Sequence, residues 1–147
     1  MKYISLIISC GLTGAIFWMS SSTGTESSSL SYPIAEAVQR IIAVITPQIE
    51  IDILILQTII RKSAHVFEYF LLGIAYAVTF HYFKLPLWSL VLAGLVIAFI
   101  DEGSQFLPAG RGPSIIDVII YDFPSYLIGS LITKAIVQNH SHKINVS

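Results

Sequence analysis

Two polar patches hold most of the side chains in this sequence that can transfer protons or bind a charged ligand. The first runs from Arg61 to Tyr69 and the second from Asp101 to Asp117, and each adjoins a long apolar run. Carboxylates, basic groups and an imidazole occur together in them. Such groups can hold a phosphate and can donate or accept a proton near neutral pH. We therefore expect these patches to meet on one side of a membrane and form one site.

Helical spacing gathers the first patch onto one face. Lys62, His65 and Tyr69 lie three and four residues apart, so on a helix they project from one stripe. Arg61 and Glu68 flank that stripe. The cations suit a phosphate, and His65 is the natural proton donor or acceptor.

The second patch combines carboxylates with an arginine on a constrained loop. Asp101 and Gln105 are one helical turn apart, and Asp117 is expected in the first turn of a later helix, where the helix dipole favours a negative charge. Arg111 stands between two glycines in a loop bounded by prolines. Charged groups near membrane depth cost about 3 kcal/mol each, so we expect those of the two patches to face each other or a wet cavity.

Each of these residues also has a plain structural interpretation. Arg61 and Lys62 are of the type that anchors a helix end at lipid headgroups. A single histidine is often a hydrogen-bonding residue between helices, and acidic residues can simply end or begin a helix. Asp122, beside Pro124 in an apolar run, must be either paired or protonated. Taken together the patches point to a site, because acidic clusters do not reach headgroups as lysines do.

Composition indicates an integral membrane protein of one domain. The 147 residues are 54% hydrophobic and 12% charged, about half the usual charged share of ~25% in soluble domains, and mean hydropathy is +0.76. A formal net charge of −1 gives no basic excess, which argues against nucleic-acid binding. The single Cys10 excludes an internal disulfide framework. No known metal-ligand spacing is present and the cofactors are unknown, although Asp101 or Asp117 could bind a divalent cation that bridges to a phosphate.

The predicted fold is all-α, with four transmembrane helices at about 3–19, 63–83, 87–105 and 114–137. One or two interfacial amphipathic helices are expected after the first span, in segment 34–60, because polar residues interrupt it and Pro47 ends a helix near Thr46. Segment 20–31 is read as a flexible polar loop, and the fourth helix as kinked near Pro124. Segment 138–147 is read as a polar, mobile tail. A cleaved signal peptide is the alternative for the first span.

Four spans place both termini on one side of the membrane and both patches on the other. The count of basic residues near the two sides is a tie, with Lys2, Lys84, Lys134 and Lys143 against Arg40, Arg61, Lys62 and Arg111. The tie is broken if Arg61, Lys62 and Arg111 belong to a site. We then predict cytoplasmic termini and extracytoplasmic patches.

The patches resemble the motifs of the VanZ-like family of small membrane proteins. The first reads Arg-Lys-x-x-His-x-x-x-Tyr and the second Asp-Glu-x-x-Gln-x-x-x-x-x-Arg-x-x-Ser-x-x-Asp. Segment 18–28 is similar to that family's Phe-Ser-Ser-x-x-Gly-x-x-Ser entry. The resemblance covers roughly 15–137 and implies a single membrane domain over 1–137. The sequence departs from the family pattern between Asp117 and Gly129, so the resemblance does not imply close helix packing there.

The family is named for a member associated with resistance to the glycopeptide teicoplanin. The resemblance implies a role in the cell envelope and a location in the bacterial cytoplasmic (inner) membrane, but no particular reaction. The family's motif positions carry over onto the matching residues of this chain. We take His65, Asp101 and Asp117 as catalytic candidates, and as substrate-binding candidates Lys62, Tyr69, Glu102, Gln105, Arg111 and Ser114.

Three functions compete at this stage. The first is binding or processing of a lipid-linked or phosphate-bearing envelope component, with membrane lipids or a lipid-linked envelope precursor as partners. If the chain is an enzyme, phosphoryl transfer or hydrolysis fits these groups best. The second is a non-catalytic protein whose charged cluster holds the helices together or binds a partner. The third, a small ion or proton transporter, is least favoured because nearly all the charge lies at one face.

Overall fold

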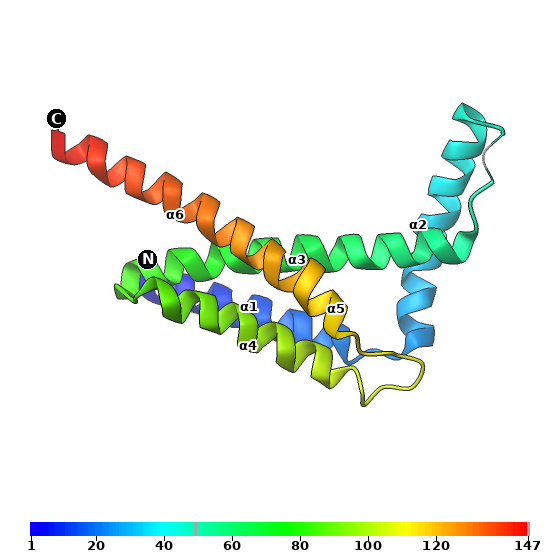
Figure 1. The fold of residues 1–147 in the computed structure, drawn as a ribbon, viewed down its shortest axis with the longest axis horizontal. Helices are drawn as coiled ribbons and strands as arrows, with labels where there is room; N and C mark the ends of the chain where they lie inside the picture. The colour runs from blue at the N-terminus through cyan, green and yellow to red at the C-terminus, as the bar shows by residue number, and fades with distance from the viewer. Residues whose placement is uncertain (49, 147) are drawn as a thin grey trace.

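The computed structural model describes residues 1–48 and 50–146, with side chains described as far as Gln138. Within these residues the chain is all-helical and contains no strand. The helices, shown in Figure 1, are α1 (Lys2–Ser20), α2 (Gly24–Ile45), α3 (Ile53–Phe83), α4 (Leu87–Ser104), α5 (Ile115–Asp117), the π-helix η1 (Val118–Asp122) and α6 (Phe123–Val146).

Four helical segments are long and apolar enough to cross a membrane: Lys2–Ser20, Ile53–Phe83, Leu87–Ser104 and Ile115–Gln138. The predicted class, a multi-pass all-α membrane protein, is confirmed. Figure 1 shows α1, α3, α4 and α6 packed as a bundle with both chain ends at the same end of it. The loop between α4 and α5 lies at the other end, beside the start of α2.

Helix α2 begins ten residues earlier than the sequence suggested. Its N-terminus is a capping box in which the Thr23 hydroxyl accepts from the Glu26 amide and the Glu26 carboxylate accepts from the Thr23 amide at 2.8 Å. The predicted loop over 20–31 is therefore wrong from Gly24 onward. The helix ends at Ile45, two residues before Pro47, as predicted.

Segment 34–60 holds the end of the crosswise helix α2 and the start of the spanning helix α3. Helix α2 runs across the bundle and packs on the N-terminal part of α3 (Figure 1). Helix α3 starts at Ile53, because the Asp52 side chain caps it by accepting from the Leu54 amide at 2.8 Å. The first polar patch thus lies inside a 31-residue helix.

Two glycines let α3 and α6 pack with their backbones in contact. A Cβ atom at Gly73 would overlap the carbonyl of Tyr126, and one at Gly129 would overlap the carbonyl of Phe70. The Ser130 hydroxyl donates to the Gly73 carbonyl at 3.1 Å and joins the two helices there. Close packing, which the departure from the family pattern left unpredicted, is therefore present. It fixes α3 against α6 next to the polar patches.

The last spanning segment, Ile115–Gln138, lies within one residue of the predicted 114–137 at each end. It begins at Ile115 and passes through the π-helix η1, in which the Phe123 amide donates to the Val118 carbonyl five residues earlier. Pro124 has no amide to donate, and both a proline and a π-helical turn are usual causes of a bend in a helix. The segment from 138, predicted as a tail, continues α6 to Val146.

Candidate functional site

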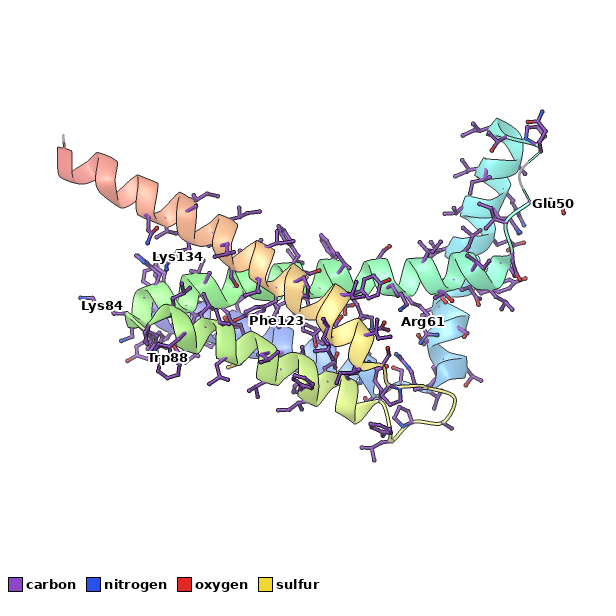
Figure 2. All side chains as sticks on the ribbon, viewed as in Figure 1. Glu50, Arg61, Lys84, Trp88, Phe123 and Lys134 are labelled. Atoms are coloured by element: carbon purple, nitrogen blue, oxygen red, sulfur yellow. The ribbon has the colours of Figure 1, made fainter. Side chains whose placement is uncertain are left out.

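The two polar patches meet around one cavity of about 240 Å³ at the end of the bundle where the α4–α5 loop lies. Helix α3 supplies one wall, the end of α4 and the loop supply a second, and α5 with η1 supplies a third. Figure 2 shows Arg61 on α3 at this end. The lining residues are Thr58, Arg61, Lys62, His65, Glu102, Gln105, Gly110, Arg111, Gly112, Asp117, Tyr121 and Asp122.

Most of the predicted site residues line this cavity, and three do not. Tyr69 and Asp101 lie fully buried behind it, where the Tyr69 hydroxyl donates to the Asp101 carboxylate at 3.0 Å and joins α3 to α4. Ser114 is the N-cap of α5, and its amide donates to Glu102. These three positions support the wall of the cavity instead of facing it.

An ion pair joins the two patches directly. The Lys62 ammonium lies 2.6 Å from a carboxylate oxygen of Asp117, across 55 positions of sequence. The same ammonium lies over the ring of Tyr121, 4.5 Å from its centroid, which adds a cation–π contact. Both charged side chains keep about a third of their surface exposed. The pair therefore fixes the position of α5 more than it neutralises a buried charge.

Glu102 fastens the end of α4 to the loop that follows it. One carboxylate oxygen accepts from the Gln105 side chain at 3.0 Å, and the other accepts from the Ser114 amide. Glu102 and Gln105 are both buried. Because two donors satisfy this buried carboxylate, Glu102 holds the loop in place across the mouth of the cavity.

Arg111 is held by backbone carbonyls instead of by an acid. Its Nε donates to the Ser22 carbonyl at 3.1 Å and its Nη2 to the Met19 carbonyl at 3.2 Å. Burial, and then the positive charge of Arg61, lower the pKa of the Arg111 guanidinium. The guanidinium groups of Arg61 and Arg111 are therefore close enough for their positive charges to repel each other. A guanidinium has more N–H donors than these two bonds use, so others remain for a ligand.

A backbone contact presents the loop that carries Arg111. The Gly24 amide donates to the Ala109 carbonyl at 3.0 Å, and a Cβ atom at Gly24 would overlap the carbonyl of Gly110. Gly110 itself has a φ of 75°, in the left-handed region that glycine adopts at no steric cost. The start of α2 thus positions the arginine of the second patch.

Asp122 lines the cavity, although sequence reasoning left it out of the site. It is 1% exposed, and among the described residues neither of its carboxylate oxygens has a hydrogen-bond partner. Its Oδ1 lies 3.8 Å from Nδ1 of His65, beyond hydrogen-bond distance. The signal was present in the sequence as an acid inside an apolar run, but its neighbour across the bundle was not visible there.

The described side chains offer two kinds of chemistry in this cavity. Arg61 and Arg111 line it without an acidic partner, since the ion pairs found within 4.0 Å in the described residues use Arg40, Lys62 and His65. His65 and Asp122 provide a proton donor–acceptor pair in the same cavity. No group of three or more His, Cys, Asp or Glu residues in the described part of the chain is placed to hold a metal ion.

Comparison with known proteins supports the resemblance seen in the sequence. The family model described as VanZ/LLP1 matches residues 5–137. This range contains both polar patches, all of α2 and almost all of the four spanning segments. No curated protein and no solved structure matches the chain.

Proposed function

The chain belongs to the VanZ/LLP1 family, and from that premise we propose that its polar cavity binds the phosphate-bearing headgroup of a lipid-linked envelope component. One observation carries the proposal. Arg61 and Arg111 line the same cavity, and neither is within 4.0 Å of a carboxylate in the described residues. Two like charges near each other are unfavourable unless an anion lies beside them.

Phosphate is the anion that fits two guanidinium groups best. Their planar N–H forks match its oxygens with paired, charge-assisted hydrogen bonds. A cavity of about 240 Å³ is smaller than the ~300 Å³ at which pockets for drug-sized ligands begin, so it suits a headgroup without its chain. The chain would remain in the bilayer. A phosphate carried on a lipid therefore fits better than a free soluble metabolite.

A shallow groove gives such a lipid a path to the cavity. It lies between α2 and α3, is lined by Thr25, Ser28 and Gln57 among others, and shares Arg61 and Gly110 with the cavity. Helix α2 runs crosswise to the bundle, as an interfacial helix does, and leaves apolar side chains such as Leu30 exposed. We infer that α2 lies on the membrane surface and admits the headgroup along its polar residues.

His65 and Asp122 extend the proposal from binding to processing. They stand in the same cavity as the two arginines, so a proton can be moved beside the bound phosphate. Phosphoryl transfer or hydrolysis is the reaction class that these groups suit. The other catalytic candidates are better explained as positioning residues, since Asp101 accepts from Tyr69 and Asp117 pairs with Lys62.

A second function is favoured for part of the cluster. The Tyr69–Asp101, Glu102–Ser114 and Lys62–Asp117 contacts each join separate helices or a helix and a loop. These residues hold the bundle together, as the non-catalytic alternative expects. We propose that the cluster is divided, with these residues structural and the two arginines, His65 and Asp122 facing the ligand.

We propose further that the cavity faces away from the cytoplasm of a bacterial inner membrane. The opposite end holds Lys2, Lys84 and Lys134, and none of the nine acidic residues falls in 1–25, 69–100 or 123–147. Once Arg61, Lys62 and Arg111 are assigned to the site, most of the remaining basic residues near the spans lie at this end, which the positive-inside rule makes cytoplasmic. A reporter active only in the cytoplasm, fused after the last residue, should be active; activity of a periplasmic reporter there would reverse the orientation.

The binding proposal is tested with farnesyl monophosphate and farnesol, titrated calorimetrically into purified protein in detergent. We expect the phosphate to bind at least about tenfold more tightly than the alcohol, and Arg61→Gln to lose about tenfold of that affinity. Arg40→Gln removes a cation that is paired on the surface and serves as the matched control. Equal affinity for phosphate and alcohol, or no effect of Arg61→Gln in a folded protein, would overturn the proposal.

A further inference from the structure

A second and larger cavity, of about 450 Å³, lies at the opposite end of the bundle between α3, α4 and α6. Ala77, Phe80 and Leu90 contribute to its apolar wall, and Lys84 and Lys134 stand at it with His81. Figure 2 shows Lys84, Trp88 and Lys134 at this end, far along the bundle from Arg61. The cavity is therefore separate from the site described above.

Among the described residues, the cations of this cavity have no internal counter-charge. No acidic residue lines it, and none of the described lysines at this end forms an ion pair within 4.0 Å. The acidic residues nearest in sequence to Lys84 and Lys134 are Glu68 and Asp122, and both belong to the other half of the bundle. A positively charged rim over an apolar wall is complementary to an amphiphile with a negative head.

Lys84 stands at a position that favours glycine. It caps α3 with φ 54° and ψ 36°, and it is the one non-glycine residue with positive φ in the described part of the chain. Glycine is the usual residue at such a helix end, because a Cβ atom is strained in the left-handed region. Lys84 has a strained backbone at a position where its side chain supplies a cation to the cavity. Because such strain is often found at binding sites, this combination points to a ligand.

The cavity also lies where lipid headgroups are found. Helix α3 ends at Phe83 and α4 begins at Leu87, so the turn between two spans borders it. Trp88 in that first turn of α4 is 67% exposed, as expected of an aromatic anchor at the membrane boundary. A charged ligand in this cavity would thus have its head at the boundary and its tail along the bundle.

We propose that this cavity binds an anionic glycerophospholipid, with its phosphate at Lys84 and Lys134 and an acyl chain along Phe80 and Leu90. The two lysines select the charge of the headgroup, and the apolar wall supplies affinity without selectivity. The proposal does not depend on the function of the first cavity, because no residue lines both.

Native mass spectrometry of delipidated protein tests this proposal, with phosphatidylglycerol and phosphatidylcholine of the same chains added in turn. We expect the wild type to retain phosphatidylglycerol about tenfold more tightly, and the double variant Lys84→Gly/Lys134→Gln to lose that preference. Arg40→Gln and Arg61→Gln, which remove cations at the other end, should keep it. Equal retention of the two lipids by the wild type would overturn the proposal.

Lys84→Gly alone separates lipid binding from folding. Glycine relieves the left-handed strain, so the lipid-free variant should unfold at the same temperature as the wild type or higher. Its preference for phosphatidylglycerol should nevertheless fall. A variant that is as stable as the wild type and keeps the full preference would show that Lys84 does not contact the lipid, and would also overturn the proposal.

Discussion

At the end of the bundle that holds Arg61 and Asp122, carboxylates and cations from separate helices line one cavity, and Lys62 and Asp117 form an ion pair there. At the other end the lysines stand beside an apolar cavity with no acidic residue lining it. Part of the charge at the first end is thus paired or hydrogen-bonded inside the protein, and we infer that this part contributes to stability, whereas Arg61 and Arg111 have no acidic partner within the described residues. At the second end no lysine forms an ion pair within the described residues, and we infer that an external anion balances their charge. The following predictions test this difference, from the largest expected effect to the smallest.

Removal of a buried carboxylate at the cavity end should have the largest effect. Glu102→Ala leaves the Ser114 amide and the Gln105 side chain without their acceptor, and hydrogen bonds to charged groups contribute about 2–3 kcal/mol. We expect a loss of about 3 kcal/mol, measured as thermal unfolding in detergent. Lys134→Ala, at the other end, should change stability by less than about 0.5 kcal/mol without lipid. Equal losses in the two variants would contradict the comparison.

Tyr69→Phe tests whether the buried hydrogen bond behind the cavity is structural. The substitution keeps the ring packed in the core and removes only the hydroxyl that donates to Asp101. We expect a loss of about 2 kcal/mol in the same unfolding measurement, because a buried carboxylate oxygen then has no donor. Affinity for farnesyl monophosphate should not change in the folded variant. A fall in affinity with unchanged stability would instead place Tyr69 in the ligand site.

Asp122→Asn should act in the opposite direction. The side chain is buried without a hydrogen-bond partner in the described residues, so its charged form is unfavourable there, and a neutral amide of the same shape removes that cost. We expect a gain of about 1 kcal/mol in stability, together with the loss of any phosphoryl transfer or hydrolysis of a bound lipid phosphate. This combination is typical of functional residues. A loss of stability would show that Asp122 is a structural residue.

The smallest effect is expected at the surface of α2. The Arg40 guanidinium pairs with Glu36 one turn earlier, and both side chains are largely exposed. Such pairs contribute about 0.3–0.5 kcal/mol to stability. The loss of stability in Arg40→Gln should therefore be near the limit of detection in the unfolding measurement. A larger loss, or any change in the affinity of either cavity for its lipid, would show that a cation on α2 takes part in a site.

The sequence predicted the fold class and the convergence of the patches for clear physical reasons. Uninterrupted apolar runs of spanning length have one stable arrangement in a bilayer. The cost of an isolated charge at membrane depth then requires polar patches at the same depth to face each other. Lys62 and Asp117, far apart in sequence, meet for this reason.

Other features could not be read from local sequence. The serine-rich start of α2 resembles a loop because serine hydroxyls compete for backbone hydrogen bonds, yet a capping box and the burial of Ser31 and Ala35 make it helical. The sequence showed that Asp122 was anomalous but not that His65 lay beside it. The lipid cavity was missed because its lysines are far apart in sequence and none is unusual alone.

The most direct test of the account is native mass spectrometry of protein purified gently from its membrane, with the wild type, Arg61→Gln and Lys84→Gly compared. We predict two co-purifying lipid classes on the wild type. Arg61→Gln should lose a lipid-linked phosphate and keep the anionic phospholipid, and Lys84→Gly should do the reverse. A wild type without a lipid-linked phosphate, or one that keeps it unchanged in Arg61→Gln, would contradict the assignment of the polar cavity as a phosphate site.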